Sequence, residues 1–198
     1  MQLDSAAINH LTARVGVVPH WYLWVTARNR STGLDETIGI WTGRRDVSLT
    51  VEGASRTYTR AGALMQVGPI TFEPGPVVRR QTVTLSPLST QVTDMIRTYD
   101  ARLAKADLHL GMHDPESGDL VSIPRVFRGV IDKAPVVTPA KGGMSTVQVT
   151  MVSNARDMTR KLALKRSDES QRLRSDDRFR RYASVSGSVG VWWGEERS

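Results

Sequence analysis

The sequence predicts a mainly β protein, an antiparallel β-barrel or sandwich with one or two short helices and an extended C-terminal arm. Short segments rich in β-branched and aromatic residues recur through the first 154 residues, and turn-forming Gly, Pro, Asn and Asp separate them. Many short strands at close intervals are typical of barrels and sandwiches. After Asn154 apolar residues become sparse, so the compact core is expected to end there.

The N-terminal residues 4–15, DSAAINHLTARV, predict a short helix with Asp4 or Ser5 as its cap. We expect Pro19 to end this helix. The apolar positions near helical spacing are Ala7, Ile8, Leu11 and Val15.

Two β-hairpins are expected next. Residues 21–30 and 38–43 predict strands joined by a loop from Ser31 to Thr37, because both are rich in aromatic and β-branched residues. Residues 47–62 repeat the arrangement around the turn sequence Glu52-Gly53-Ala54-Ser55, in which Gly53 supplies the conformationally permissive position.

The middle of the chain predicts one strand and one helix. In residues 77–86, Val83 and Leu85 alternate with threonines and should face the core. Residues 90–105 predict a helix capped by Thr90. The apolar stripe of that helix is Val92, Ile96, Tyr99 and Leu103.

The last strands are expected at residues 106–114 and 125–137, paired through the turn residues between them, and at residues 145–153. The inward positions of the last strand are Val147, Val149 and Met151. Residues 154–166 predict a short helix with Met158, Leu162 and Leu164 on its inner side. The expected domains are therefore residues 1–154, a β-barrel with a short N-terminal helix, and residues 155–198, a basic helix and arm.

Composition and charge limit the classes of function. The chain has no Cys, which excludes disulfides, thiolate zinc sites, iron–sulfur clusters and a Cys nucleophile. The net charge of +7 is uneven, because Ala155 to Arg181 contain ten Lys or Arg and five Asp or Glu. A basic segment can bind nucleic acid, but interspersed acids favour a solvated face or an ion-paired protein interface. The N-terminus lacks a signal peptide pattern and no apolar run reaches the roughly 20 residues of a membrane span, so we expect a soluble protein made in the cytoplasm.

No catalytic, cofactor or metal site is expected. His109 and His113 have the i, i+4 spacing of a helical metal site, but in a strand they would lie more than about 13 Å apart. We therefore expect solvated or hydrogen-bonded imidazoles. The sequence has no GxSxG, GxGxxG or GxxxxGK[ST] pattern. Asp176 and Asp177 fit surface ion pairs better than cation ligands.

The tryptophans fall into two groups. Trp21, Trp24 and Trp41 lie in predicted strands, where core or rim packing explains them, whereas Trp192 and Trp193 follow a Gly/Ser-rich connector. Adjacent strand residues point to opposite faces, so one indole can pack on its own domain while the other contacts a partner. The candidate interface residues are Arg166, Arg172, Arg174, Asp176, Asp177, Phe179, Tyr182, Trp192 and Trp193.

The order of these segments resembles that of tail-tip proteins of long-tailed phages and prophages, the distal tail or baseplate hub family. The segments in this order are WTG, YTRAGALMQVGPI, VTLS, VFRGVID, a Gly-Gly turn, STVQVTMVS, RSDESQRLRSDDRFRRYA and a closing WWG. Together they cover most of the chain. The resemblance is strongest at Phe127-Arg128-Gly129 and in the arm from Arg166 to Gly194.

The resemblance implies a tail-tube-like β-barrel, a structural rather than enzymatic role in the virion tail tip, and no cofactor. It implies a hexameric or trimeric ring around the DNA channel, with residues 1–154 forming the ring, and contacts with tail tube, hub and tape-measure-type proteins. DNA would pass through without sequence-specific binding. Some hub relatives carry Cys-rich C-terminal sequence, which this chain lacks, so the six-fold distal tail ring and the three-fold hub both stay open. The alternatives are a nucleic-acid-binding β-barrel with a basic arm and a hydrolase whose site is assembled from residues distant in the sequence.

Overall fold

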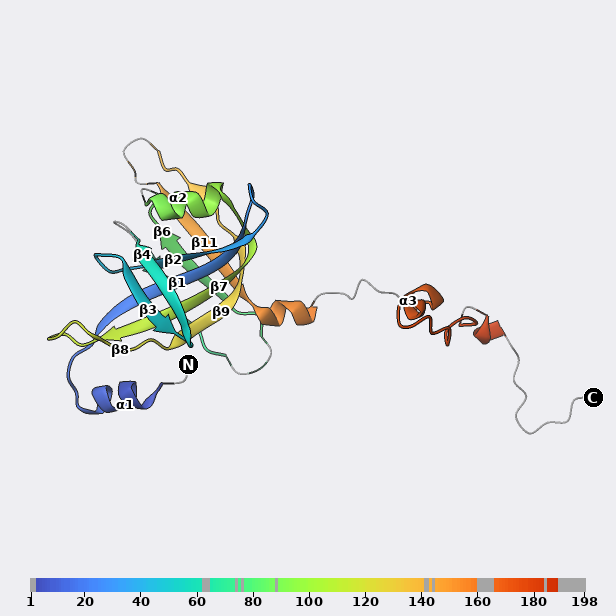
Figure 1. Ribbon diagram of the computed structural model, residues 1–198, viewed down its shortest axis with the longest axis horizontal. Coiled ribbons are helices and arrows are strands. Elements are labelled where there is room, and N and C mark those ends of the chain that lie inside the picture. The colour runs from blue at the N-terminus through green and yellow to red at the C-terminus, as the bar shows by residue number, and fades with distance from the viewer. Residues whose placement is uncertain are drawn as a thin grey trace, which may run out of the picture. The chain divides into compact units, whose positions relative to one another are not determined.

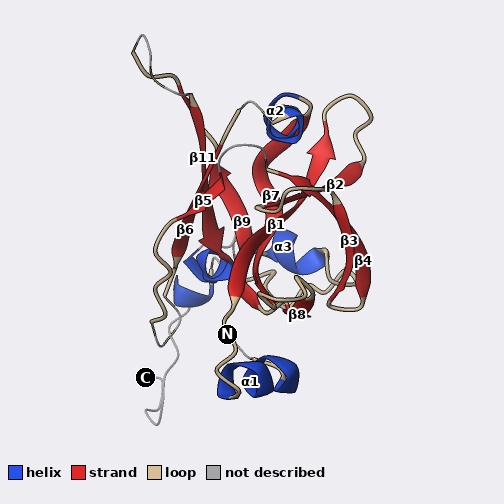
Figure 2. Cartoon of the chain, turned by 90° about the vertical axis from the view of Figure 1, so that its left-hand side faces the viewer, coloured by secondary structure: helices blue, strands red, loops and turns tan. Residues whose placement is uncertain are grey.

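A computed structural model describes residues 3–61, 65–73, 75, 77–87, 89–140, 143, 145–159, 166–183 and 185–188. The chain divides into two compact units, Met1–Met158 and Thr159–Ser198. The first unit is a curled, mixed β-sheet that forms half a barrel, and the chain as a whole is mainly β with few helices, which confirms the fold class (Figures 1 and 2).

The first unit is built on a sheet with the strand order β3-β4-β2-β1-β7-β9-β11-β6-β5. Two short strands join it from the side, β8 on β7 and β10 on β11. The pairs are antiparallel, except that β2 and β4 pair in parallel. The strands are β1 (Val18–Asn29), β2 (Asp35–Trp41), β3 (Val47–Val51), β4 (Ala54–Arg60), β5 (Met65–Val67), β6 (Arg80–Leu85), β7 (Tyr99–His113), β8 (Leu120–Ser122), β9 (Arg125–Lys133), β10 (Val136–Val137) and β11 (Thr146–Ser153).

The main core lies against one face of the curled sheet. Alternation sends Leu23 and Val25 of β1 into this core, together with apolar residues of β2, β6, β7, β9 and β11. The predicted inward positions are confirmed here, because all of them are fully buried: Val83, Leu85, Val147, Val149 and Met151.

Helix α2 (Thr90–Arg97) lies at one end of the curled sheet (Figures 1 and 2), where it buries Val92 and Met95 in the main core. Its N-cap is Ser89 rather than Thr90. The predicted helix is too long: β7 begins at Tyr99, and Leu103 is 52% exposed with φ +65°. The helical spacing was misleading because residues after 98 pair with β1, and that pairing is irregular between Lys105 and Asp100.

Helix α1 (Ser5–Thr12) confirms the expected N-terminal helix, and Asp4 caps it by accepting a 2.8 Å hydrogen bond from the backbone N–H of Ala7. Only Ala7 of the expected apolar stripe is buried. Pro19 does not end the helix, which stops at Thr12, because Pro19 belongs to β1 and pairs with Met112. The other stripe residues, Ile8, Leu11 and Val15, are exposed.

The hairpin of β3 and β4 forms as expected, with Glu52 and Gly53 at φ +51° and +78° in its turn. Left-handed conformations at both positions match the twist of a two-residue hairpin. The hairpin covers the second face of β1, where Tyr22, Trp41, Val51 and Tyr58 form a smaller core. Trp24 and Trp41 therefore have the packing role expected of them, and Trp21 packs against the main core.

The first unit ends in a 3-10 helix, η1 (Asn154–Thr159). The expected inward orientation of Met158 is wrong, since Met158 is 78% exposed. Leu162 and Leu164 lie outside the described residues. Among the described residues, no helix combines the length and apolar composition that a membrane crossing requires.

Candidate functional site

The second unit contains all nine predicted interface residues, and its described part includes the short helix α3 (Asp168–Arg172). The Ser167 side chain caps this helix by accepting a 3.3 Å hydrogen bond from the backbone N–H of Ser170. Asp168 and Glu169 follow in the first turn, where acidic side chains favour helix formation. The local sequence therefore specifies this turn of helix.

The acidic side chains around α3 bind arginines of the same segment. Arg172 contacts Asp176 at 3.2 Å and Glu169 at 3.5 Å, and Arg178 contacts Asp168 at 2.7 Å. Hydrogen bonds to these aspartates raise the pKa of both arginines above the usual value. Two of the predicted interface residues, Arg172 and Asp176, are therefore partners of each other.

Asp177 has a different environment from its neighbour Asp176. Its carboxylate accepts a hydrogen bond from the Gln171 side chain and a 3.0 Å bond from the backbone N–H of Phe179. These bonds, the Gln171 bond foremost, lower the pKa of Asp177. The backbone at Ser175 and Asp176 is left-handed, with φ +55° at both. The two aspartates thus stabilise a turn within the segment.

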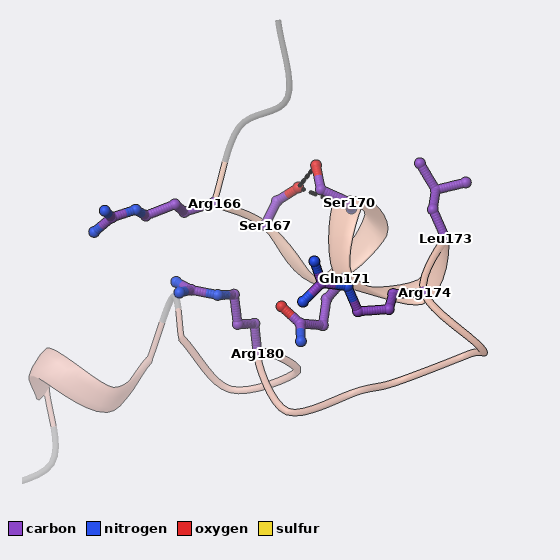
Figure 3. Close-up of a pocket in the computed structure, with 7 residues that line it drawn as sticks. All are labelled: Arg166, Ser167, Ser170, Gln171, Leu173, Arg174 and Arg180. Atoms are coloured by element: carbon purple, nitrogen blue, oxygen red, sulfur yellow. Dashed lines mark hydrogen bonds between the residues drawn. The ribbon is translucent and has the colours of Figure 1, made fainter. Parts of the chain in front are cut away.

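A hollow of about 460 Å³ lies between α3 and the returning chain (Figure 3). The side chains of Gln171 and Arg174 point toward the space that Arg166 and Arg180 border, whereas Leu173 points away from it. Six of its seven lining residues are polar or cationic, and Leu173 is apolar. We call this feature the arginine hollow, formed by Arg166, Ser167, Ser170, Gln171, Leu173, Arg174 and Arg180.

Large apolar side chains on the second unit are exposed. Phe179 is 86% and Leu173 78% exposed, and Arg181 lies over the ring of the exposed Tyr182 at 5.5 Å. Trp192 and Trp193 lie outside the described residues. The assignment of this segment as an interface stays a prediction.

Sequence reasoning missed an ionic network in the first unit, where the β3–β4 hairpin meets β7 and β9. Glu52, in the turn of that hairpin, binds Arg125 and also Arg128, the latter at 2.8 Å. Asp107 of β7 binds Arg128 at 2.6 Å and faces Arg56 at 3.9 Å.

Arg56 is the most enclosed member of this network. Its side chain is only 10% exposed, lies 3.4 Å from Glu52, and stacks over the Trp24 ring at 5.3 Å. Side chains alternate between the two faces along β7 and β9, which places Asp107 and Arg128 on the same face. This alternation is the sequence feature from which part of the network could have been predicted. The position of the β3–β4 hairpin over this face is set by tertiary packing, which the local sequence does not show.

His109 is fully buried beneath this network, and neither ring nitrogen has a hydrogen-bond partner among the described residues. Burial lowers the pKa of His109 to about 4, against a smaller opposing effect of Asp107. The expectation of a solvated or hydrogen-bonded imidazole is wrong for His109, because the hairpin covers it. It is right for His113, whose ring nitrogens lie 2.9 Å from the Tyr22 hydroxyl and 3.0 Å from the Gly118 carbonyl.

A metal centre finds no support in the described part of the chain, where no three His, Asp or Glu side chains form a group that could hold an ion. Both histidines of the i, i+4 pair lie in the strand β7, as the sequence indicated. His113 packs edge-on against the His20 ring, with the ring centroids 5.0 Å apart.

No family model matches this sequence, and no curated protein matches it either. Among solved structures, the chain is similar to a chain in the virion of a native gene transfer agent particle, with a TM-score of 0.51 and 14% sequence identity. The similarity covers 83% of this chain and 50% of the other, so the present chain spans about half the length of the one it matches. At this identity the likeness concerns the fold.

Proposed function

We propose that the protein is a structural component of the tail tip of a phage or phage-like particle, in a distal tail or baseplate hub. The observation that carries this proposal is the fold likeness to a virion chain, which extends over 83% of the present chain. The order of sequence segments that resembles tail-tip proteins supports the same assignment. The role is architectural, and it requires neither a cofactor nor a catalytic group.

In this proposal the first unit forms a ring of six or three copies around the DNA channel and joins the tail tube to the host-recognition apparatus. Within the described residues, the path of paired strands ends at β3 and β5, whose outer edges offer backbone groups to another copy. Val136 and Val137 of β10 are also exposed. In a closed ring each exposed edge can contact a neighbouring copy, and the assembly stops growing once the ring is complete.

The second unit, with the sequence up to Gly194, serves as a docking arm in this proposal. Its exposed Phe179 and Tyr182 supply apolar contact area, and its charged side chains select the partner. The partners are other tail proteins, of the tail tube, hub or tape-measure type. DNA crosses the ring without sequence-specific contacts.

The test is a truncation after Lys165, compared with a full-length variant in which Trp192 and Trp193 are both Ala. We expect each protein to be folded and rich in β-structure by circular dichroism, because the first unit ends at Met158. We also expect each to be missing from purified particles by mass spectrometry. A matched control replaces the exposed Ile8 by Ala, which removes an apolar side chain outside the arm and should leave incorporation unchanged.

Normal incorporation of the truncated protein would contradict the docking role of the arm. Loss of its β-structure would contradict the independence of the first unit. Absence of the wild-type protein from particles would contradict the proposed function as a whole.

A further inference from the structure

The arginine hollow gathers three arginines without a close ion pair among the described residues, although the charge of Arg174 helps to lower the pKa of Asp177. Arg166, Arg174 and Arg180 all border this space (Figure 3). Among the described residues, none of the three has a carboxylate within ion-pair distance. Guanidinium groups that share a hollow repel one another unless an anion lies between them.

The acids that the structure describes in this segment already have other partners, Glu169 being bound to Arg172. Asp168 is bound to Arg178, Asp176 to Arg172, and Asp177 to Gln171 and a backbone N–H. Arg172 and Arg178 thus have close acidic partners within the segment, whereas Arg166, Arg174 and Arg180 have none at ion-pair distance among the described residues. These three arginines are available to an anion from outside.

The chemistry of the lining suits an oxyanion such as a carboxylate. A guanidinium group binds a carboxylate through two parallel N–H bonds, and the nearby Ser167, Ser170 and Gln171 add polar atoms to the same wall. Phosphate groups of DNA offer similar oxygens. The charge of the lining therefore suits either anion, and the exposed apolar side chains of the segment distinguish the two partners.

The exposed apolar side chains of the same segment also favour a protein partner. Leu173, Phe179 and Tyr182 are 78%, 86% and 65% exposed, and a protein surface can bury such side chains. A DNA duplex, whose outer surface is the charged backbone, offers little apolar surface against which these side chains could be buried. An acidic protein segment with apolar neighbours therefore matches both features of this region.

The first unit of another copy of this chain is a poor partner for the arginine hollow, because both carry positive charge. Residues 1–158 contain 17 Lys or Arg and 14 Asp or Glu, so that unit is itself positively charged. We infer that the arginine hollow receives the carboxylate side chains of an acidic segment on a different virion protein. The inference rests on the proposed function and names the chemistry of the partner.

The experiment places the photo-reactive residue benzoylphenylalanine at Phe179 of the full-length chain, in cells that assemble the particles. Irradiated particles are purified, treated with nuclease and analysed by mass spectrometry. We expect the adduct to contain a peptide of a different virion protein with several Asp or Glu residues. Replacing Arg166, Arg174 and Arg180 by Gln should lower its yield by about tenfold or more, since charge-assisted hydrogen bonds are lost.

The matched control replaces three exposed arginines of the first unit, Arg14, Arg44 and Arg102, by Gln, and so removes the same charge. It should keep the adduct. The inference is overturned by an adduct to another copy of this chain, to DNA or to a peptide without acids, or by an unchanged yield in the hollow variant. In each of these cases the protein is still present in particles and the proposed function stands. Absence of the unsubstituted protein from particles overturns both.

Discussion

Protonation of His109 should destabilise the folded protein at mildly acidic pH. The side chain is fully buried and has no hydrogen-bond partner among the described residues, and burial lowers its pKa from 6.5 to about 4. Between these two values the unfolded chain binds a proton that the folded chain does not. The free energy of unfolding therefore falls as the pH falls from about 6.5 to 4, and this contribution is fully present above pH 6.5.

The size of the effect follows from the pKa difference. One pKa unit corresponds to about 1.36 kcal/mol, so the shift of His109 corresponds to about 3 kcal/mol between pH 7 and pH 4. His109→Gln keeps a polar side chain of similar size that does not titrate. As the pH falls from 7 to 4, the free energy of unfolding of the variant should therefore decrease by about 3 kcal/mol less than that of the wild type.

The assay is urea unfolding followed by tryptophan fluorescence at half-unit steps between pH 7.5 and 4. The quantity compared is the change in unfolding free energy with pH, so any constant offset between the two proteins is irrelevant. Parallel curves for wild type and His109→Gln would refute the assignment of His109 as a buried, neutral imidazole.

Three further substitutions test the packing of the first unit by urea unfolding, each beside a control substitution; the control Gly187→Ala lies in the second unit. Asp107→Asn should cost about 3 kcal/mol because it leaves a mostly buried arginine without that partner, whereas Asp132→Asn, in a more exposed ion pair, should cost about 1 kcal/mol or less. Gly129→Ala should cost about 1–3 kcal/mol or more, since its Cβ would lie 2.1 Å from a backbone oxygen of β11, while Gly187→Ala meets nothing within 4 Å and should have little effect. Met95→Ala should cost about 2–5 kcal/mol because the side chain is fully buried, and Met95→Leu less than about 1.5 kcal/mol; equal costs would contradict the core position.

The sequence predicts the strands better than it predicts where helices stop. Val83, Leu85 and Val147 follow a strict period of two, and each is fully buried as expected. Tyr99 and Leu103 continue the helical spacing of α2 but belong to β7, because pairing with β1 overrides the local pattern. Long-range pairing of this kind has no signal within a short window of sequence.

The ionic network shows a second limit. Glu52 and Arg125 are 73 residues apart in the chain, and they meet only because the β3–β4 hairpin folds over β7 and β9. The same folding encloses His109, which a strand pattern alone places on a solvated face. By contrast, the local ion pairs of the second unit are three to ten residues apart, as with Arg172 and Asp176, and a charge-dense sequence favours such pairs.

The most direct test of the proposed function is a reconstruction by electron cryo-microscopy of particles from cells that encode this chain. The account predicts six or three copies in a closed ring on the tail axis, with the curled sheet of the first unit recognisable in each copy and the channel at the centre. A single copy away from the axis would contradict the ring, and a particle that lacks the chain altogether would contradict the proposed function.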